Sequence, residues 1–157
     1  MAVKPIPDGY HSVTPYLIVG GAARALEFYQ QVFGAVEKFR MDGPDGRVGH
    51  AEIQIGDCHL MLADEHPERN IRGPLSIGGN AMSLLLYVED VDTQFQKAIE
   101  AGAQEKMPVQ DQFYGDRSGT LTDPFGHVWT IATHKEDVSF EEMQRRIAEF
   151  TKAQGAA

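Results

Sequence analysis

An internal repeat limits the possible folds of this chain more than any other feature. Each copy starts with a short run of β-forming residues, continues with a segment of helical periodicity and stops at a glycine. The first copy covers residues 14–35 and the second covers residues 83–103. Apolar residues recur every three or four positions in the middle of each copy, which indicates an amphipathic helix. Gly34 and Gly102 then stand where a left-handed C-cap is expected.

Short antiparallel strands are expected after each predicted helix. In the first copy, residues 49–55 and 58–63 flank Gly56-Asp57, which is a plausible two-residue hairpin turn. In the second copy, residues 119–122 and 127–133 flank an Asp-Pro-Phe-Gly turn. The chain therefore divides into two βαβββ modules and is predicted to be an α+β protein. The predicted boundaries are 10–65 for the first module, 66–80 for a polar linker and 81–135 for the second module.

Residues 138–153 predict a separate C-terminal helix. Ser139 and Glu142 have the spacing of a capping box, in which each side chain bonds the backbone of the other residue. An apolar stripe follows at helical spacing, and it packs either on its own module or on a partner subunit. The stripe consists of Phe140, Met143, Ile147 and Phe150.

Charge and cysteine content exclude several classes of partner. The formal net charge is -9, and no basic stripe suited to phosphate groups is present in the sequence. The single cysteine, Cys58, cannot form an internal disulfide, which fits a reducing compartment, and it is expected to be a small buried residue. No stretch is apolar enough to span a bilayer. We expect a cytoplasmic protein that binds neither nucleic acid nor membranes.

The first hairpin has two chemically different faces if Gly56-Asp57 forms its turn. Strand alternation then places Ile55 opposite Cys58, and Gln54 opposite His59. The polar face is either solvated or lines a concave site. The apolar face, which should cover the helices, shows Ala51, Ile53, Ile55, Cys58, Leu60 and Leu62, and the polar face shows His50, Glu52, Gln54, His59 and Met61.

Four short motifs accompany the repeat. They are Thr14-Pro15-Tyr16-Leu17, Glu27-Phe28-Tyr29-Gln30-Gln31-Val32-Phe33-Gly34, Gly115-Asp116-Arg117-Ser118-Gly119 and Asp123-Pro124-Phe125-Gly126-His127-Val128-Trp129. Together with the repeat, this set resembles the vicinal oxygen chelate superfamily of glyoxalases, bleomycin-resistance proteins and extradiol dioxygenases, in particular its PhnB-like branch. The resemblance covers residues 10–138. It implies that the two modules form a cup-shaped mixed β-sheet, that the polar face points into the cup, and that the protein is a homodimer.

The resemblance also implies four metal-ligand positions, two in each module. Catalytic members of the superfamily carry His, Gln or Glu there and bind one divalent metal ion. Hydroxyl groups and a thioether are poor ligands for such an ion, so we expect no cofactor at the inherited site. In this sequence the four positions fall on Thr14, Met61, Ser83 and Thr130.

Three residues of the polar face are the candidates for chemistry. His50, Glu52 and His59 would form a relocated metal site if their side chains converged. The same residues are candidates for acid–base catalysis. His127 is expected to form a hydrogen bond that stabilises its turn. The other histidines lie in predicted terminal or loop regions and show no ligand spacing, namely His11, His66 and His134.

Seven side chains are candidates for ligand binding. The segment 110–117 is read as a loop whose aromatic residues and Arg117 either contact a ligand or brace the loop, with Asp116 and Arg117 as an ion pair. Tyr16 and Tyr87 occupy matching strands of the two modules, whereas Trp129 is expected on the helix side. The full set is Tyr16, Gln54, Met61, Tyr87, Phe113, Tyr114 and Arg117.

The sequence therefore favours a glyoxalase-like protein that binds a small organic molecule in its cup without the catalytic metal of the superfamily. The alternative is a metal-dependent lyase, isomerase or dioxygenase with a relocated or atypical metal site. The two hypotheses differ in the metal content that they require.

Overall fold

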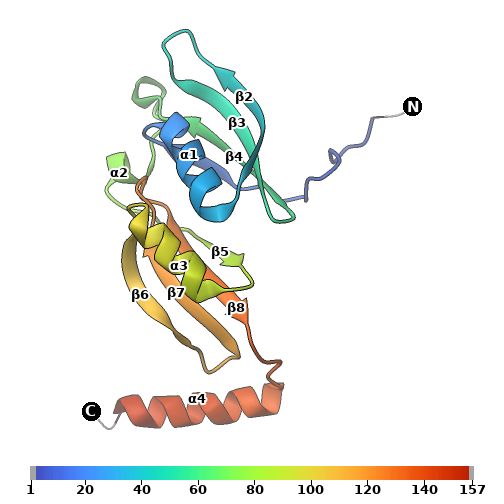
Figure 1. The fold of residues 1–157 in the computed structure, drawn as a ribbon, viewed down its shortest axis with the longest axis vertical. Coiled ribbons are helices and arrows are strands. Elements are labelled where there is room, and N and C mark those ends of the chain that lie inside the picture. Colours follow the sequence, from blue (N-terminus) through green and yellow to red (C-terminus); the bar gives the residue numbers. More distant parts are fainter. Residues whose placement is uncertain (1–2, 156–157) are drawn as a thin grey trace. The chain divides into compact units, whose positions relative to one another are not determined.

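The first module is a four-stranded mixed sheet with a helix against one face (Figure 1). The computed structural model describes residues 3–155. The strand order is β1-β4-β3-β2, in which β1 runs parallel to β4 and the other pairs are antiparallel. The elements are β1 (Tyr16–Val19), α1 (Ala22–Phe33), β2 (Val36–Asp42), β3 (Val48–Ile55) and β4 (Cys58–Asp64). The expected βαβββ order is confirmed here.

Helix α1 is held by apolar packing and by a cap from a distant strand. Its inward side buries Leu26 and Tyr29 completely, or nearly so, against the sheet. The N-cap residue Gly21 has no side chain to satisfy the first amides. The buried carboxylate of Asp64 replaces it, accepting hydrogen bonds from the amides of Gly21 and Ala22, both at 2.8 Å. The end of β4 therefore fixes the start of α1.

The linker contains more structure than the sequence suggested. A 3₁₀ helix, η1 (Pro67–Arg69), and a one-turn helix, α2 (Pro74–Ile77), lie between the modules. Both begin with proline, whose fixed φ suits the first helical position. A β-bridge between His66 and Ile71 closes the loop around η1.

The second module repeats the first. Its strand order is β5-β8-β7-β6, with β5 parallel to β8 and the other pairs antiparallel. Within the described residues the eight strands form two separate four-stranded sheets. The chain divides into two compact units, and residues 123–127 belong to the unit of the first module. The elements are β5 (Ser83–Tyr87), α3 (Val91–Glu100), β6 (Gln104–Asp111), β7 (Asp116–Thr122) and β8 (Val128–His134).

Helix α3 covers one face of the second sheet, and its contacts explain one glycine of β7. The side chain of Asp90 caps the helix by accepting from the Thr93 amide at 3.1 Å. Phe95 is buried against the sheet. A Cβ atom on Gly119 would lie 2.8 Å from the Phe95 ring, so only glycine permits this approach. Trp129 is also buried, as its place on the helix side predicts.

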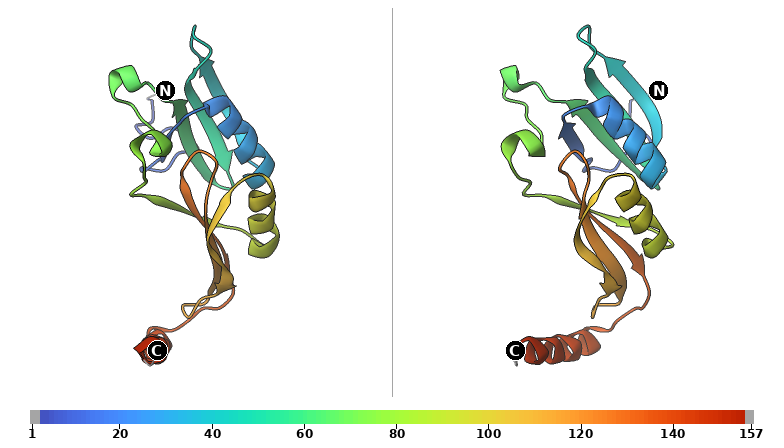
Figure 2. Two further views of the ribbon diagram at one scale, coloured as in Figure 1. Left: turned by 90° about the vertical axis from the view of Figure 1, so that its left-hand side faces the viewer. Right: turned by 60° about the vertical axis from the view of Figure 1, so that its left-hand side comes forward.

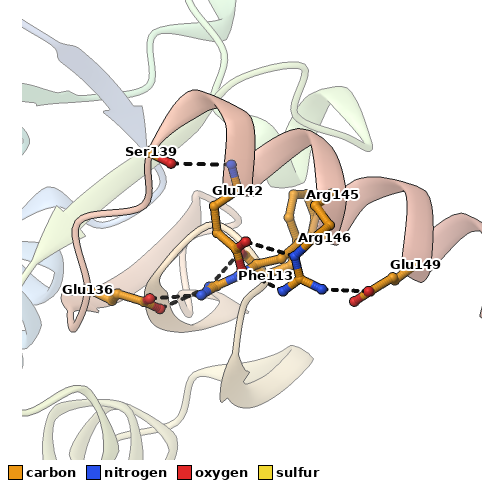
Figure 3. Close-up of polar contacts among 7 residues, drawn as sticks. All are labelled: Phe113, Glu136, Ser139, Glu142, Arg145, Arg146 and Glu149. Atoms are coloured by element: carbon orange, nitrogen blue, oxygen red, sulfur yellow. Dashed lines mark hydrogen bonds and ion pairs between the residues drawn. The ribbon is translucent and has the colours of Figure 1, made fainter.

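Helix α4 (Phe140–Gly155) is attached to the second unit through Arg146 (Figure 3). The Arg146 guanidinium pairs with Glu136 at 2.8 Å and with Glu142 at 2.7 Å. It also donates to the carbonyl oxygen of Phe113 at 3.2 Å, in the turn between β6 and β7. One side chain thus joins the helix to the hairpin and to the segment that leaves β8.

The capping box of α4 is only half confirmed. The amide of Glu142 donates to Ser139 Oγ at 3.3 Å, as predicted. The Glu142 carboxylate instead binds Arg145 and Arg146, both at 2.7 Å. Charge-assisted bonds of this kind are stronger than a bond to a neutral backbone amide, which explains the departure.

Most of the apolar stripe on α4 is not covered by its own chain. Phe140 is 78% exposed, Ile147 44% and Phe150 48%. Phe150 contacts the ring of Phe113 at 5.7 Å between centroids, which is the partial packing that the second unit provides. Within residues 3–155 no helix combines the length and the apolar character needed to cross a membrane.

Candidate ligand-binding site

The polar face of the first sheet is the strongest candidate site. The observed register pairs Ile55 with Cys58, Gln54 with His59, and Glu52 with Met61, so the predicted turn at Gly56-Asp57 is confirmed. Most of the alternate residues on β3 and β4 are buried on the side of α1, and the polar residues lie on the opposite side of the sheet. We use the term polar face for His50, Glu52, Gln54, His59 and Met61, together with Tyr16 of the neighbouring strand β1.

Cys58 departs from the predicted pattern. It belongs by alternation to the apolar face, yet its side chain is exposed. Cys58 is the first residue of β4, immediately after the turn. The expectation of a buried thiol is therefore wrong.

A chain of hydrogen bonds crosses the polar face. The phenol oxygen of Tyr16 lies 2.8 Å from His50 Nδ1, and His50 Nε2 lies 3.2 Å from Glu52 Oε1. An ionised carboxylate only accepts, so the neutral imidazole carries its proton on Nε2 and accepts from the Tyr16 hydroxyl at Nδ1. The side chains of His50 and Glu52 are 22% and 25% exposed, which leaves part of each accessible to a bound molecule.

Tyr10 completes this arrangement, and the sequence analysis did not identify it. Its hydroxyl donates to the second carboxylate oxygen of Glu52, and its ring stacks on His59 at 4.5 Å between centroids. His59 Nδ1 donates to the carbonyl oxygen of Gly9 at 2.6 Å. Figure 2 shows the N-terminal segment and α1 on opposite sides of the first sheet. Residues before β1 therefore contribute directly to the polar face.

These contacts set the ionisation of the site. The pKa of Glu52 is lowered, chiefly by the hydrogen bond from Tyr10 and further by the bond from His50. Burial raises the pKa of Tyr10 to about 12, and the bond to Glu52 adds to this effect. Burial also raises the pKa of Tyr16. At neutral pH the site therefore presents one carboxylate anion, held by donors on two sides.

Exposed apolar side chains border the polar face along β2. The register places Phe39 beside Glu52 and Met41 beside His50. Phe39 is 50% exposed and Met41 is 54% exposed, and the Phe39 ring lies 6.1 Å from that of His50. Small-molecule sites usually combine apolar and aromatic side chains with a few hydrogen-bonding groups, and both are present here.

The structure gathers some of the predicted ligand-binding residues and not others. Tyr16 and Met61 lie on the polar face beside the three catalytic candidates. Gln54 lies at its edge, where its amide donates to the carbonyl oxygen of Gly56 at 3.0 Å. The other four candidates belong to the second unit: Tyr87, Phe113, Tyr114 and Arg117.

The predicted Asp116–Arg117 ion pair does not form. Both residues belong to β7, and successive residues of a strand point to opposite faces. Arg117 binds Asp92 at the start of α3 through two bonds of 2.7 Å, and also binds Asp111 at 3.1 Å. Its guanidinium is thus occupied by structural partners. The segment read as a loop is a strand at both ends, since β6 extends to Asp111 and β7 begins at Asp116.

A second polar network lies on the other face of the second sheet. The buried carboxylate of Asp116 accepts from the Tyr87 hydroxyl at 2.8 Å and from His134 Nδ1 at 2.7 Å. His134 Nε2 in turn binds Asp137 at 3.0 Å, and the bond to Asp116 raises the pKa of His134. His134 is the last residue of β8, so the prediction that it lies in a terminal or loop region is wrong.

His127 has a structural role, although not within its own turn. The ring is buried, and its Nε2 lies 3.1 Å from the carbonyl oxygen of Ile18. Its other nitrogen lies 3.3 Å from the side-chain amide of Asn80. The turn itself is closed by Asp123, which also accepts from the Tyr29 hydroxyl at 2.6 Å.

The residues at the inherited metal positions do not fit a divalent ion. Thr14 Oγ1 lies 3.4 Å from the carbonyl oxygen of His11, and Thr130 Oγ1 lies 3.0 Å from the hydroxyl of Thr120. Hydroxyl groups engaged in this way, with the exposed Ser83 and the thioether of Met61, offer no anionic or imidazole ligand. No chemistry is therefore assigned to a metal at these positions.

The side chains of His50, Glu52 and His59, the candidates for a relocated metal site, also do not converge. His59 donates from Nδ1 to the Gly9 carbonyl and stacks on Tyr10, and within the described residues its ligand atoms do not come within 4.8 Å of those of both His50 and Glu52. Among the residues that the structure describes, a different trio brings three potential ligand atoms within 4.8 Å of one another. That trio is His11, Asp57 and Cys58, at the exposed end of the hairpin.

The two modules define the class of protein. Each is a βαβββ unit in which the first and last strands pair in parallel, and this duplicated arrangement is the glyoxalase fold. The Glyoxalase/Bleomycin resistance protein/Dioxygenase superfamily model matches residues 9–131. The chain belongs to this superfamily.

Similar proteins agree with this assignment. Uncharacterized protein Rv0887c of Mycobacterium tuberculosis is 40% identical over 136 residues, which cover 85% of this chain and 80% of that protein. TioX from Micromonospora sp. ML1 has a TM-score of 0.62 at 26% identity and covers 79% of this chain and 98% of its own. The PhnB protein from Bacillus cereus has a TM-score of 0.62 at 23% identity, covering 78% and 99% respectively, and supports the fold alone.

Proposed function

We propose that this protein binds a small, planar aromatic molecule on its polar face and that it does so without a metal ion at the inherited positions. The observation that carries this proposal is the combination of the Tyr16–His50–Glu52 hydrogen-bond chain with the exposed ring of Phe39 beside it. The side chain of Met41 extends the apolar border and adapts readily to different ring shapes.

The charge of the site favours one class of aromatic ligand. Glu52 is an anion at neutral pH, and the chain as a whole carries a formal net charge of -9. A neutral or cationic ring with an N–H or O–H donor would pair with this carboxylate, whereas an anionic ring would be repelled. The expected ligand is therefore a donor-bearing aromatic molecule.

Fluorescence titration with two dyes tests this proposal. Ethidium is a planar cationic aromatic molecule, and anilinonaphthalene sulfonate is an anionic one. In buffer containing EDTA, we expect ethidium to bind more tightly than the sulfonate. Phe39→Ala should weaken ethidium binding by roughly 3- to 10-fold, the usual contribution of an aromatic contact. Tyr16→Phe should also weaken it, since His50 loses its hydroxyl partner.

The matched control is Ile77→Ala, which removes an exposed apolar side chain from α2. This variant should bind ethidium like the unmodified protein. If Phe39→Ala and Tyr16→Phe also bind like Ile77→Ala, the polar face is not the site and the proposal is wrong.

Elemental analysis tests the proposed absence of the inherited metal. The variant to use is the double substitution His11→Ala with Cys58→Ser, so that the exposed trio cannot contribute. After dialysis against trace zinc, iron, manganese and nickel, we expect no stoichiometric metal. One equivalent that is lost on Glu52→Ala would contradict the proposal and favour a metal-dependent lyase, isomerase or dioxygenase.

A second candidate function is metal-free acid–base catalysis on the bound molecule. The observation in its favour is the contact between His50 Nε2 and Glu52, because a carboxylate that orients an imidazole is a common device for proton transfer. Incubation of a bound donor-bearing aromatic molecule, followed by mass spectrometry and NMR, would reveal turnover. Turnover that is abolished by His50→Gln would establish catalysis, whereas an unchanged ligand would leave binding as the function.

We further propose a homodimer located in a reducing compartment such as the cytoplasm. The exposed apolar stripe on α4 and the exposed thiol of Cys58 support these two points respectively. A sedimentation-equilibrium mass equal to one chain at micromolar concentration would contradict the dimer.

A further inference from the structure

Three potential metal ligands meet at the end of the first hairpin, outside the polar face. His11 comes from the segment before β1, whereas Asp57 and Cys58 come from the turn between β3 and β4. One ligand atom of each lies within 4.8 Å of the other two, and Cys58 Sγ lies 3.5 Å from Asp57 Oδ1. All three residues are exposed. A bound ion could thus reach all three ligands without rearrangement of the sheet.

The position of His11 is determined by its neighbours in the chain. Tyr10 stacks on His59 and donates to Glu52, and the Gly9 carbonyl accepts from His59. These contacts hold the N-terminal segment, which we define as residues 9–11, on the sheet next to the turn. The meeting of His11 with Cys58 therefore follows from packing on two anchored residues.

Gly9 shows that this packing has specific sequence requirements. Its φ of +84° lies in the left-handed region that favours glycine. A Cβ atom at this position would lie 2.8 Å from Cε1 of His59. Both the backbone conformation and the available space therefore require glycine where the segment meets the sheet.

The turn places its two ligands on the same side as His11. Gly56 has a φ of +57°, which gives the two-residue turn its geometry. Asp57 lies within the turn and Cys58 begins β4, so the two are adjacent but not both constrained by strand alternation. A carboxylate, a thiol and an imidazole thus point to one volume.

We propose that His11, Asp57 and Cys58 form a zinc site that fastens the N-terminal segment over the polar face. Zinc accepts sulfur, imidazole nitrogen and carboxylate oxygen together, and three protein ligands leave a fourth position for water. Binding releases the thiol proton of Cys58 to solvent as the Zn–S bond forms. The ion would hold Tyr10 against Glu52 and so control access to the polar face.

This site differs from the inherited positions of the superfamily. It shares no residue with Thr14, Met61, Ser83 and Thr130. The proposal also stands independently of the aromatic ligand, because zinc binding is measured without any organic molecule present.

Cobalt titration of the reduced, metal-free full chain tests the site directly. Co²⁺ takes the place of zinc and gives a thiolate-to-metal absorption band only when sulfur is a ligand. We expect one equivalent of Co²⁺ to bind with this band and to be displaced by zinc. Cys58→Ser should abolish the band, and His11→Ala and Asp57→Asn should each weaken binding by about 10- to 100-fold or more, since changes even outside the ligand shell cost this much.

The matched control is His66→Ala, which removes another partly exposed histidine of the same unit. It should bind Co²⁺ like the unmodified protein. The site is refuted if no thiolate band develops, or if His11→Ala binds as tightly as His66→Ala.

Amide hydrogen exchange tests the fastening of the N-terminal segment. Zinc should slow exchange at Tyr10 and His11 in the unmodified protein by tenfold or more, and it should have no effect in Cys58→Ser. If zinc binds at the site but exchange at these amides is unchanged, the ion does not fasten the segment and this part of the proposal is wrong.

Discussion

The Nε2 atom of His50 lies 3.2 Å from Oε1 of Glu52, and the other oxygen of this carboxylate accepts from Tyr10. One acidic side chain thus orients both a histidine from its own strand and a tyrosine from before the first strand. Because this partly buried carboxylate accepts both hydrogen bonds, the loss of its charge would weaken the bond from His50 and the bond from Tyr10.

Glu52→Gln is predicted to weaken ethidium binding by roughly tenfold or more. The glutamine amide has no negative charge. It also replaces one carboxylate oxygen, which accepts, with an NH₂ group, which donates, so the hydrogen bond from either Tyr10 or His50 is lost. Hydrogen bonds to charged groups contribute about 1.5–3 kcal/mol, which corresponds to this loss. Isothermal titration calorimetry measures the effect, with Glu37→Gln on the exposed strand β2 as the control. Equal affinities in the two variants would show that Glu52 does not contact the ligand.

Ionisation of Tyr10 is predicted to lower the free energy of unfolding at high pH. Its pKa is raised to about 12 in the folded protein, chiefly by burial, whereas an unfolded tyrosine titrates near 10. A raised pKa contributes stability that is complete below the unfolded value and is lost as the pH rises toward the folded value. The free energy of unfolding should therefore fall between about pH 10 and 12, and this slope should be smaller in Tyr10→Phe. Urea denaturation at a series of pH values measures both slopes, and identical slopes would contradict the assignment.

Arg146 is predicted to hold α4 on the second unit, whereas its neighbour Arg145 is not. Within residues 3–155 the partners of Arg145 are Glu142 and Glu149 of its own helix, whereas Arg146 also binds Glu136 and the Phe113 carbonyl (Figure 3). Arg146→Met should release α4 from the hairpin and increase its rate of limited proteolysis severalfold, with little change in the unfolding of the sheets. Arg145→Met should leave the rate close to that of the unmodified chain. Similar rates for both variants would show that Arg146 does not hold the helix.

Substitution of two glycines with positive φ should distinguish the steric cost of a Cβ atom from the cost of the left-handed backbone conformation. Gly115 (φ +102°) leaves no space, since a Cβ atom would lie 2.2 Å from the carbonyl oxygen of Glu136. Gly46 (φ +80°) has nothing within 4 Å of the same atom. Gly46→Ala should cost about 1 kcal/mol, from the left-handed conformation alone. Gly115→Ala should cost at least about 2 kcal/mol more, because backbone must move. Chemical denaturation compares the two, and equal costs would contradict the close approach at Gly115.

Much of the fold could be predicted from local patterns. Helical periodicity after each β-rich run, followed by a glycine stop, predicted α1 and α3. Helix α1 buries all four apolar residues that the spacing indicated, whereas α3 buries Val91, Phe95 and Ala98 and leaves Ile99 half-buried. The turn at Gly56-Asp57 set the register of β3 and β4, because a two-residue turn permits one pairing only. The polar face followed from that register.

Other parts of the site depend on contacts between segments distant in sequence. Tyr10 reaches Glu52, Asp116 binds His134, and His11 meets Cys58, and none of these pairs has a spacing that a local pattern would reveal. The burial of Cys58 was mispredicted, since alternation assigns a residue to a face but does not determine how much of its side chain is covered at the end of a strand.

The sequence by itself determined the two modules and, in the first module, the register of β3 with β4 and the apolar and polar faces of that hairpin, because these follow from local periodicity and turn chemistry. Only the tertiary structure decided which polar groups meet. Arg117 forms its ion pair with Asp92 and not with its neighbour Asp116, since adjacent strand residues face opposite sides of the sheet. The partners of a polar side chain are set by the packing of whole elements, and that packing is not encoded at any single position in the chain.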